Sequence, residues 1–257
     1  MAEVVEGSGS SPRTVRDMPS LRASTVTAFE LCPRQWASRY YYGTEEKESA
    51  ALRTGTAAHS VIEDALRGRP LDLSVMKDVK RPGESKAVLE YVSSLEGLRA
   101  KTWLVEHRWE LPWRSDAPPL SGTMDVVAVD PDMLLIADHK TNRKPETVDD
   151  WKKKIQPRLY AYAARRLWDW TGYPMIRFQI GYVLLGIERE WTIGPEEDDI
   201  TIARVGTAWD AMLEYERLNG WPERLNPYCR YCPIKNYCQS FAQSEAAAKS
   251  FFPNFAK

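Results

Sequence analysis

Asp125, Asp138 and Lys140 stand in a mostly apolar hairpin-like stretch near the middle of the chain, from Gly122 to Lys140. Its two apolar runs flank the turn-forming cluster Asp130-Pro131-Asp132, which predicts a β-hairpin. Side chains two residues apart in a strand share a face, so Asp138 and Lys140 should project together, and strand pairing can bring Asp125 close to them. Burying an unpaired charge costs free energy, so these charged side chains need a partner of opposite charge. A divalent metal beside a phosphate would be such a partner.

The order of the predicted elements indicates an α/β fold with a central mixed β-sheet flanked by helices. With 257 residues, the chain is long enough for one large domain, expected at 20–242, between a disordered N-terminal tail at 1–19 and a C-terminal tail at 243–257. Besides the hairpin, alternating or apolar runs predict strands at 102–112, 175–185 and 188–193. Apolar periodicity predicts helices at 24–36, 54–67, 84–98, 148–171 (starting or kinking at the proline at 157) and 200–218.

Charge and hydropathy limit which cellular compartment and which classes of binding partner we expect. No apolar run approaches the roughly 20 residues of a membrane span, and the first residues lack the apolar core of a signal peptide. We therefore expect a cytoplasmic protein with no membrane partner. Because the net charge is −1, a nucleic-acid partner must be held by a local basic surface. The candidates are Lys152, Lys153, Lys154 and Arg158, whose alternative interpretation is a solvated helix face.

The four cysteines form a pattern of one plus three. Cys229, Cys232 and Cys238 lie close together, and Cys32 lies near the other end of the chain, within the first predicted helix. Nothing in the sequence indicates secretion, so a shared metal or cluster is favoured over disulfides. Four thiolates suit zinc or an iron–sulfur cluster equally well.

Two further polar residues are candidates for the surroundings of the hairpin. His59 adjoins the apolar stripe of the helix predicted at 54–67, where it is either a ligand or an ordinary hydrogen-bonded histidine. Glu106 lies in the strand that precedes the hairpin, where it is either an outer residue of a metal site or a solvated carboxylate. His139 points away from Asp138 by strand alternation, which favours a structural role.

The motifs match a known family in their order along the chain. Asp125, followed twelve residues later by Asp138-x-Lys140, resembles the core of the PD-(D/E)xK nuclease superfamily. Gly55-x3-His59 resembles the helix that supplies a metal-binding histidine in the RecB-type branch of that superfamily.

Gln156-x3-Tyr160 resembles the Q-x-x-x-Y motif of the same branch, although Pro157 directly after Gln156 departs from a regular helix. The one-plus-three cysteines resemble the iron–sulfur members, which include the AddB-type nuclease domain and the CRISPR-associated adaptation exonuclease. The resemblance covers residues 32–238, most of the chain.

The resemblance implies a restriction-endonuclease-like core and a metal-dependent DNA exonuclease, acting at single-stranded DNA ends in recombination, repair or CRISPR adaptation. It implies Mn²⁺ or Mg²⁺ held by His59, Asp125 and Asp138, with Lys140, Gln156 and Tyr160 completing the catalytic site. It also implies that Cys32, Cys229, Cys232 and Cys238 hold one 4Fe–4S cluster, with zinc as the alternative, joining the two ends of the domain.

Implied partners are DNA and recombination, helicase or CRISPR adaptation proteins. Two other functions stay open: a non-catalytic DNA-binding or assembly module of a helicase or integrase complex, and a zinc-stapled binding protein in which D-x-K arose by chance.

Overall fold

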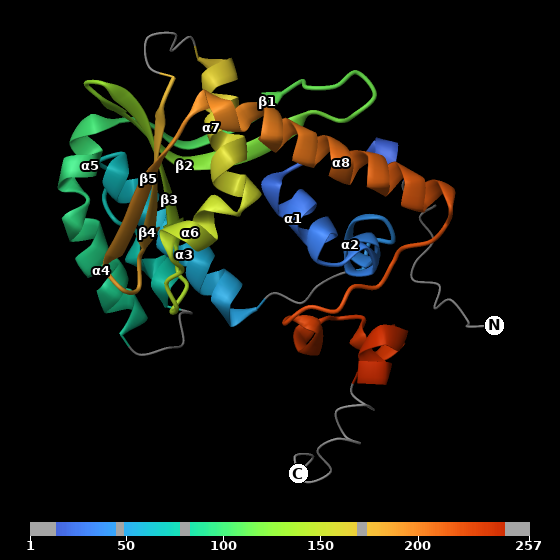
Figure 1. Cartoon of the computed structure of the whole chain (residues 1–257). Coiled ribbons are helices and arrows are strands. Elements are labelled where there is room, and N and C mark those ends of the chain that lie inside the picture. Colours follow the sequence, from blue (N-terminus) through green and yellow to red (C-terminus); the bar gives the residue numbers. More distant parts are fainter. Residues whose placement is uncertain (1–13, 45–48, 78–82, 169–173, 245–257) are drawn as a thin grey trace.

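The protein folds around one five-stranded sheet with helices on both faces (Figure 1). This is a computed structural model, and it describes residues 14–44, 49–77, 83–168 and 174–244. The strands are β1 Thr102–Leu111, β2 Leu120–Asp130, β3 Met133–Lys140, β4 Ile176–Tyr182 and β5 Ile187–Ile193. The α-helices are α1 Ala23–Leu31, α2 Pro33–Tyr40, α3 Ala50–Leu66, α4 Glu84–Ser94, α5 Glu96–Lys101, α6 Val148–Lys152, α7 Ile155–Leu167 and α8 Asp198–Arg217.

The sheet is mixed, with the strands in sequence order from β1 to β5. Neighbouring strands are antiparallel except β3 and β4, which run parallel. A parallel pair needs a crossover connection, and α6 and α7 occupy it. β3 therefore lies in the centre of the sheet, with its C-terminal end close to the start of the crossover.

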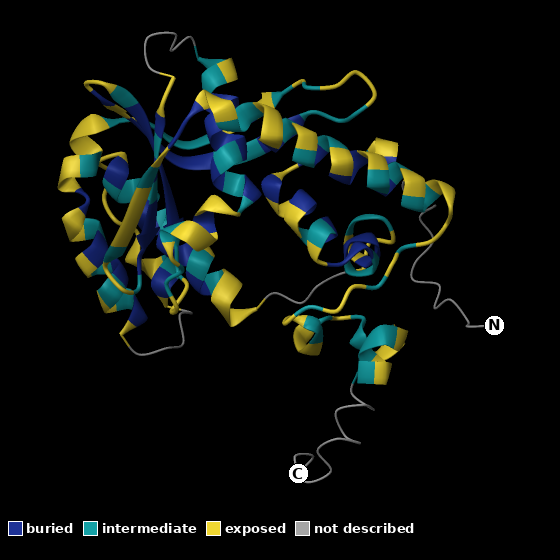
Figure 2. Ribbon diagram, in the orientation of Figure 1, coloured by how far each residue is buried: buried dark blue, intermediate teal, exposed yellow. Residues whose placement is uncertain are grey.

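Two apolar clusters cover the two faces of the sheet (Figures 1 and 2). On one face, α1, α7 and α8 pack on β3 through residues such as Leu159, Trp209 and Ile136. On the other face, α3 and α4 pack through Ile62 and Val88. Among the helices that the structure describes, none combines the length and the apolar character needed to cross a membrane.

These features confirm the predicted α/β class and mixed sheet flanked by helices. The hairpin is present with its turn at Asp130-Pro131-Asp132, and the three other predicted strands are present to within a few residues. The segment predicted at 148–171 is split into α6 and α7, and Pro157 lies in the first turn of α7, where its missing N–H costs no hydrogen bond. The helix predicted at 84–98 is likewise two helices, α4 and α5.

The prediction that Cys32 lies within a helix is wrong. Cys32 is extended (φ −163°, ψ 106°) between α1 and α2, and Pro33 is the first residue of α2. A residue before proline is driven out of the helical region, and proline itself is favoured at a helix start. The break places Cys32 at the junction between two helices, where it is buried.

The disordered tail predicted at 1–19 is wrong for its last residues. Val15–Asp17 form a short 3-10 helix, η1, and Val15 is fully buried in the core. The Val15 N–H donates to Glu216 Oε1 at 2.8 Å, which ties this segment to α8. The Gly/Ser-rich signal comes from the residues before Thr14, and residues 1–13 lie outside the described residues, as do 245–257 of the predicted C-terminal tail.

Candidate active site

Strand register brings the two hairpin carboxylates together. Val126 pairs with Ala137, so Asp125 and Asp138 occupy the next position of the antiparallel pair. Both are buried, with 9% and 2% of their surface exposed. Lys140 Nζ lies 2.6 Å from Asp138 Oδ2, which confirms that these two side chains share a face. The structure therefore brings the predicted D-x-K side chains together.

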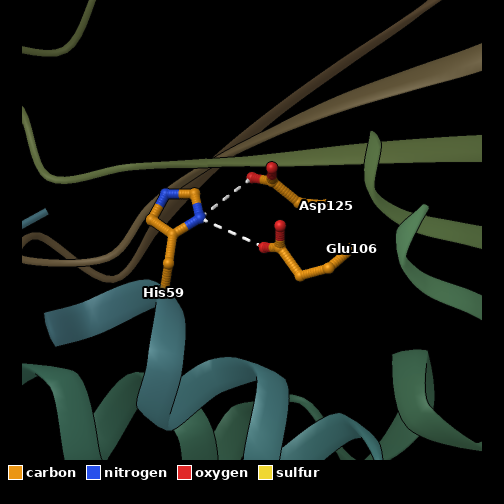
Figure 3. Close-up of side chains that lie close together, drawn as sticks. All are labelled: His59, Glu106 and Asp125. Carbon is orange, nitrogen blue, oxygen red and sulfur yellow. Dashed lines mark ion pairs between the residues drawn. The ribbon is translucent and has the colours of Figure 1, made fainter. Parts of the chain in front are cut away.

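His59 reaches the same site from α3, and its ring points toward Asp125 and Glu106 (Figure 3). Its Nδ1 lies 3.5 Å from Glu106 Oε1 and 3.6 Å from Asp125 Oδ2. Ligand atoms of these three residues all lie within 4.8 Å of one another, a spacing that can hold a metal ion. His59 Nε2 lies 2.9 Å from the carbonyl oxygen of His139. When Nε2–H donates to that carbonyl, Nδ1 presents its lone pair to the space between the two carboxylates.

Glu106 belongs to this group, although its position in the sequence predicts at most an outer residue of a metal site. It lies in β1 and has a positive φ of 49°, a conformation that non-glycine residues rarely adopt. Such backbone strain costs on the order of 1–3 kcal/mol and is concentrated at functional sites. The strained backbone directs the Glu106 carboxylate toward His59 (Figure 3). Strand alternation alone does not reveal this, because the local conformation breaks the alternation.

The charges in the site are strongly coupled. Burial alone would lower the pKa of His59, but its hydrogen bond to Glu106 and the charges of Asp125 and Asp138 raise that pKa to about 9. Burial would raise the pKa of Asp125, but the hydrogen bond from His139 and the His59 charge lower it overall. Burial raises the pKa of Asp138 despite the nearby Lys140. In this arrangement the positive charge of protonated His59 offsets part of the nearby carboxylate charge, and a divalent cation suits the same position.

Gln156 and Tyr160 lie one turn apart on α7 and both reach the site. Gln156 Nε2 donates to Asp138 Oδ1 at 2.7 Å, so both oxygens of Asp138 have a partner. Tyr160 is buried and packs edge-on against Trp109. Burial raises the pKa of Tyr160, which keeps its hydroxyl protonated. The start of α7 just before Gln156 accommodates Pro157 and leaves the motif intact.

His139 faces away from Asp138, as strand alternation predicts. Its ring packs edge-on against Tyr91 of α4, and it is 2% exposed. Its backbone N–H donates to Asp125 Oδ2 at 2.7 Å. His139 therefore fixes Asp125 through its main chain, and its carbonyl accepts from His59.

An aromatic group behind Lys140 was missed from the sequence. Lys140 Nζ lies 5.8 Å from the ring centroid of buried Trp151, and Lys154 Nζ lies 4.1 Å from it. The Trp151 indole N–H donates to the Tyr182 hydroxyl at 2.7 Å, and Tyr182 pairs with Lys140 across β3 and β4. No local motif signals this group, because the parallel strand pairing that creates it is long-range.

The four predicted DNA-binding residues divide into two pairs. Lys152 and Lys153 are exposed. Lys154 pairs with Glu146 at 2.5 Å, and Arg158 pairs with Glu197 at 2.8 Å. The exposed pair is therefore better placed to meet a phosphate backbone than the other two.

A pocket of about 560 Å³ opens beside His59. Small residues of α3, such as Gly55, Thr56 and Ser60, line it together with Glu106 and Thr141. The candidate metal group is thus reachable from solvent on the α3 side.

The four cysteines gather at the other end of the molecule. Cys229 starts the short 3-10 helix η4 Cys229–Tyr231, and Cys238 follows η5 Lys235–Tyr237. Burial first, and then the charges of Cys32, Cys229 and Cys238, raise the pKa of the Cys232 thiol, so all four lie in one neighbourhood. None of the four forms a disulfide.

Two backbone N–H groups already donate to the sulfur atoms. Asn226 N–H donates to Cys229 Sγ at 3.2 Å, and Phe241 N–H donates to Cys238 Sγ at 3.4 Å. Arg34 of α2 pairs with Glu223 at 3.3 Å and donates to the Tyr237 carbonyl at 3.1 Å, which ties the segment to the helix that follows Cys32.

Comparison with known proteins gives one family. The model of the PD-(D/E)XK nuclease superfamily matches residues 20–239. A search of curated proteins finds none that matches the chain. Among solved structures, the chain is similar to a protein from Eubacterium rectale described as "Putative exonuclease", with 16% identity, a TM-score of 0.55, and 83% of this chain and 88% of that chain covered. This likeness concerns the fold alone. A second structure, described as SSO0001, has 13% identity and a TM-score of 0.45 over 87% of both chains.

Proposed function

Because this chain belongs to the PD-(D/E)XK nuclease superfamily, we propose that it is a metal-dependent deoxyribonuclease that acts at single-stranded DNA ends. The observation that carries the proposal is the meeting of Asp125, Asp138 and Lys140 with His59 in one buried site open to solvent on one side. Burying these charged groups costs free energy, and a role in phosphodiester hydrolysis explains why the site contains them.

The residues present fit a divalent metal. His59, Glu106 and Asp125 offer one nitrogen and two carboxylates within ligand spacing, and Asp138 adds a further buried carboxylate close by. Oxygen-rich ligation suits Mg²⁺ or Mn²⁺, and the imidazole favours Mn²⁺. When bound, the metal supplies positive charge that polarises a phosphodiester oxygen and acidifies a water molecule.

The chain's own residues supply orientation and charge. Lys140 is held at Asp138 Oδ2 and backed by Trp151, so its ammonium group can donate to the attacking water or to the negative charge that develops on the phosphate. Gln156 fixes the other oxygen of Asp138, and the His139 main chain fixes Asp125. A site held this rigidly loses little entropy in reaching the transition state.

The exposed lysines Lys152 and Lys153 lie in the crossover that follows β3, and we assign them to the phosphate backbone of the substrate. Lys154 and Arg158 would join them after releasing their carboxylate partners. Action in recombination, repair or CRISPR adaptation, in the cytoplasm, follows from the resemblance of the sequence motifs.

We further propose that the four cysteines hold one 4Fe–4S cluster that joins the helix after Cys32 to the C-terminal segment. The N–H groups of Asn226 and Phe241 that donate to Cys229 Sγ and Cys238 Sγ suit thiolate ligands, which supports a shared metal group at the cysteines.

One experiment tests the proposed activity. Purified protein is incubated with 5′-labelled single-stranded and blunt duplex DNA in Mn²⁺ or Mg²⁺, and the products are sized over time. We expect faster digestion of the single strand and no digestion by Lys140→Ala, whose fold circular dichroism should show unchanged. Digestion by Lys140→Ala at the wild-type rate would overturn the assignment of the site. A protein that binds the DNA but never cuts it would instead match a non-catalytic assembly module.

A further inference from the structure

Three tyrosines in the cysteine segment point into solvent. Tyr228, Tyr231 and Tyr237 are 62%, 76% and 69% exposed. Each directly precedes a cysteine in the sequence: Cys229, Cys232 and Cys238, which are half-buried. The backbone therefore turns each thiol inward and leaves the neighbouring ring outside.

This exposure is unusual within the molecule. Large aromatic side chains such as Trp36, Trp209 and Tyr182 are fully buried, because each buries roughly 150–250 Å² of surface and contributes strongly to the core. Three rings left in water within ten residues form an aromatic surface of the kind that marks a binding site.

The segment that carries the rings is held in place by its main chain. The Tyr228 N–H donates to Asn226 Oδ1 at 2.9 Å, and Lys235 Nζ donates to the Arg230 carbonyl at 3.0 Å. Arg34 of α2 donates to the Tyr237 carbonyl at 3.1 Å. The rings are thus presented by an anchored backbone, which lowers the entropy cost of binding through them.

The charge of the segment is positive in a chain whose net charge is −1. Residues 224–244 contain Arg224, Arg230 and Lys235 and no Asp or Glu. The Arg230 guanidinium lies 5.7 Å from the centroid of the Tyr231 ring, so a cation and an aromatic face are offered together. A partner that complements this surface carries regularly spaced negative charges and flat rings that are free to stack. Single-stranded nucleic acid has both properties. A duplex keeps its base faces stacked inside the helix, so it cannot use the three rings in this way.

We propose that Tyr228, Tyr231 and Tyr237 form a stacking surface for the bases of single-stranded DNA, with Arg230 and Lys235 meeting its phosphates. The surface lies on the cysteine segment, beside α2 and outside the candidate active site (Figure 1). It deepens the proposed nuclease function and rests on it for the choice of DNA. The stacking surface binds the strand outside the hairpin site, so the protein selects single strands over duplexes before cleavage.

The test is a binding measurement in the Lys140→Ala background, with metals left in place. Fluorescence anisotropy with a labelled 20-nucleotide single strand and the matching blunt duplex gives the two affinities without digestion. Changing the three tyrosines to alanine should weaken single-strand binding at least about 10-fold, since each base stacked on an aromatic ring contributes measurably. The tyrosine-to-phenylalanine triple variant should bind within about two-fold of the parent, because the rings remain. Leu225→Ala, an exposed change on the same segment, is the matched control and should have no effect.

Three results would overturn the proposal: no measurable single-strand binding by the parent, unchanged affinity in the alanine variant, or an equal loss for the duplex. Unchanged DNA affinity with lost association to a protein would assign the surface to a protein partner instead. Digestion of the labelled strand by Lys140→Ala would show, separately from the binding result, that the nuclease assignment of the site is wrong.

Discussion

The two candidate metal-binding regions of this protein are built in opposite ways. The carboxylate site takes Asp125 and Asp138 from paired central strands and His59 from a long helix packed on the sheet. The cysteine site takes Cys229 from the three-residue 3-10 helix η4, Cys232 and Cys238 from the positions just after η4 and η5, and Cys32 from a break between helices. The first is buried under two apolar clusters, whereas the second is half-exposed.

The difference shows where each geometry comes from. Strand pairing and core packing position the carboxylates, so the fold itself forms the first site. The cysteine segment has little core of its own, and its main ties to the rest are polar contacts such as Arg34 with Glu223. A group bound by the thiols should therefore add to these polar contacts in holding the segment, and changes in one region should leave the other intact.

The largest effect is expected from Asp138→Asn. The change removes a buried carboxylate that holds Lys140 and adjoins the metal group, so kcat should fall by at least about 10³-fold. Steady-state hydrolysis of labelled single-stranded DNA measures the loss, and Lys86→Ala, an exposed lysine on α4, is the control. Iron content should stay at the wild-type level. A loss of iron in Asp138→Asn would mean that the two regions are not independent.

Cys232→Ser tests the other region. It should remove the bound iron and lower the free energy of unfolding by up to about 5 kcal/mol, the loop-closure value for a link that spans the chain from Cys32 to Cys229. Visible absorbance and denaturant unfolding measure the two effects, with Asn236→Ala as the control. A colourless wild-type protein that contains stoichiometric zinc would contradict the cluster and leave the joining role intact.

Glu106→Gln should have a smaller effect, confined to metal binding. Removing the charge that faces His59 should weaken Mn²⁺ affinity about 10–100-fold, as loss of a ligand or of its supporting partner does. Isothermal titration with Mn²⁺ measures it, and Glu110→Gln, an exposed carboxylate on the same strand, should bind as the wild type does. Equal Mn²⁺ affinities in the two variants would show that Glu106 is an ordinary solvated carboxylate.

Trp151→Phe should have the smallest effect. The change keeps an aromatic ring near Lys140 but removes the N–H donated to Tyr182, so stability should fall by about 1 kcal/mol and kcat a few-fold. Trp113→Phe removes an equivalent hydrogen bond, to the Pro118 carbonyl, away from the site. If both variants lose stability equally and neither loses kcat, Trp151 does not position Lys140.

The sheet and the core of the site could be predicted because both follow from short-range periodicity. The turn at Asp130-Pro131-Asp132 fixed the hairpin, and alternation put Asp138 and Lys140 on one face. Motif order added His59, Gln156 and Tyr160, all of which reach the site.

What could not be predicted depends on long-range pairing or on local exceptions. Trp151 and Tyr182 meet Lys140 only through the parallel pairing of β3 and β4. Glu106 reaches the site because its backbone φ is positive, and no sequence pattern predicts that conformation. Pro33 did carry a readable signal, because proline at a helix start predicts the break at Cys32.

The central claim is that the carboxylate site binds the metal on which DNA cleavage depends. The most direct test titrates Mn²⁺ into metal-depleted wild type and Asp125→Asn, measuring bound Mn²⁺ by electron paramagnetic resonance and cleavage of labelled single-stranded DNA in the same samples. We predict that cleavage by the wild type rises in step with bound Mn²⁺, and that Asp125→Asn loses both. Cleavage without bound metal, or wild-type Mn²⁺ binding in Asp125→Asn, would contradict the claim.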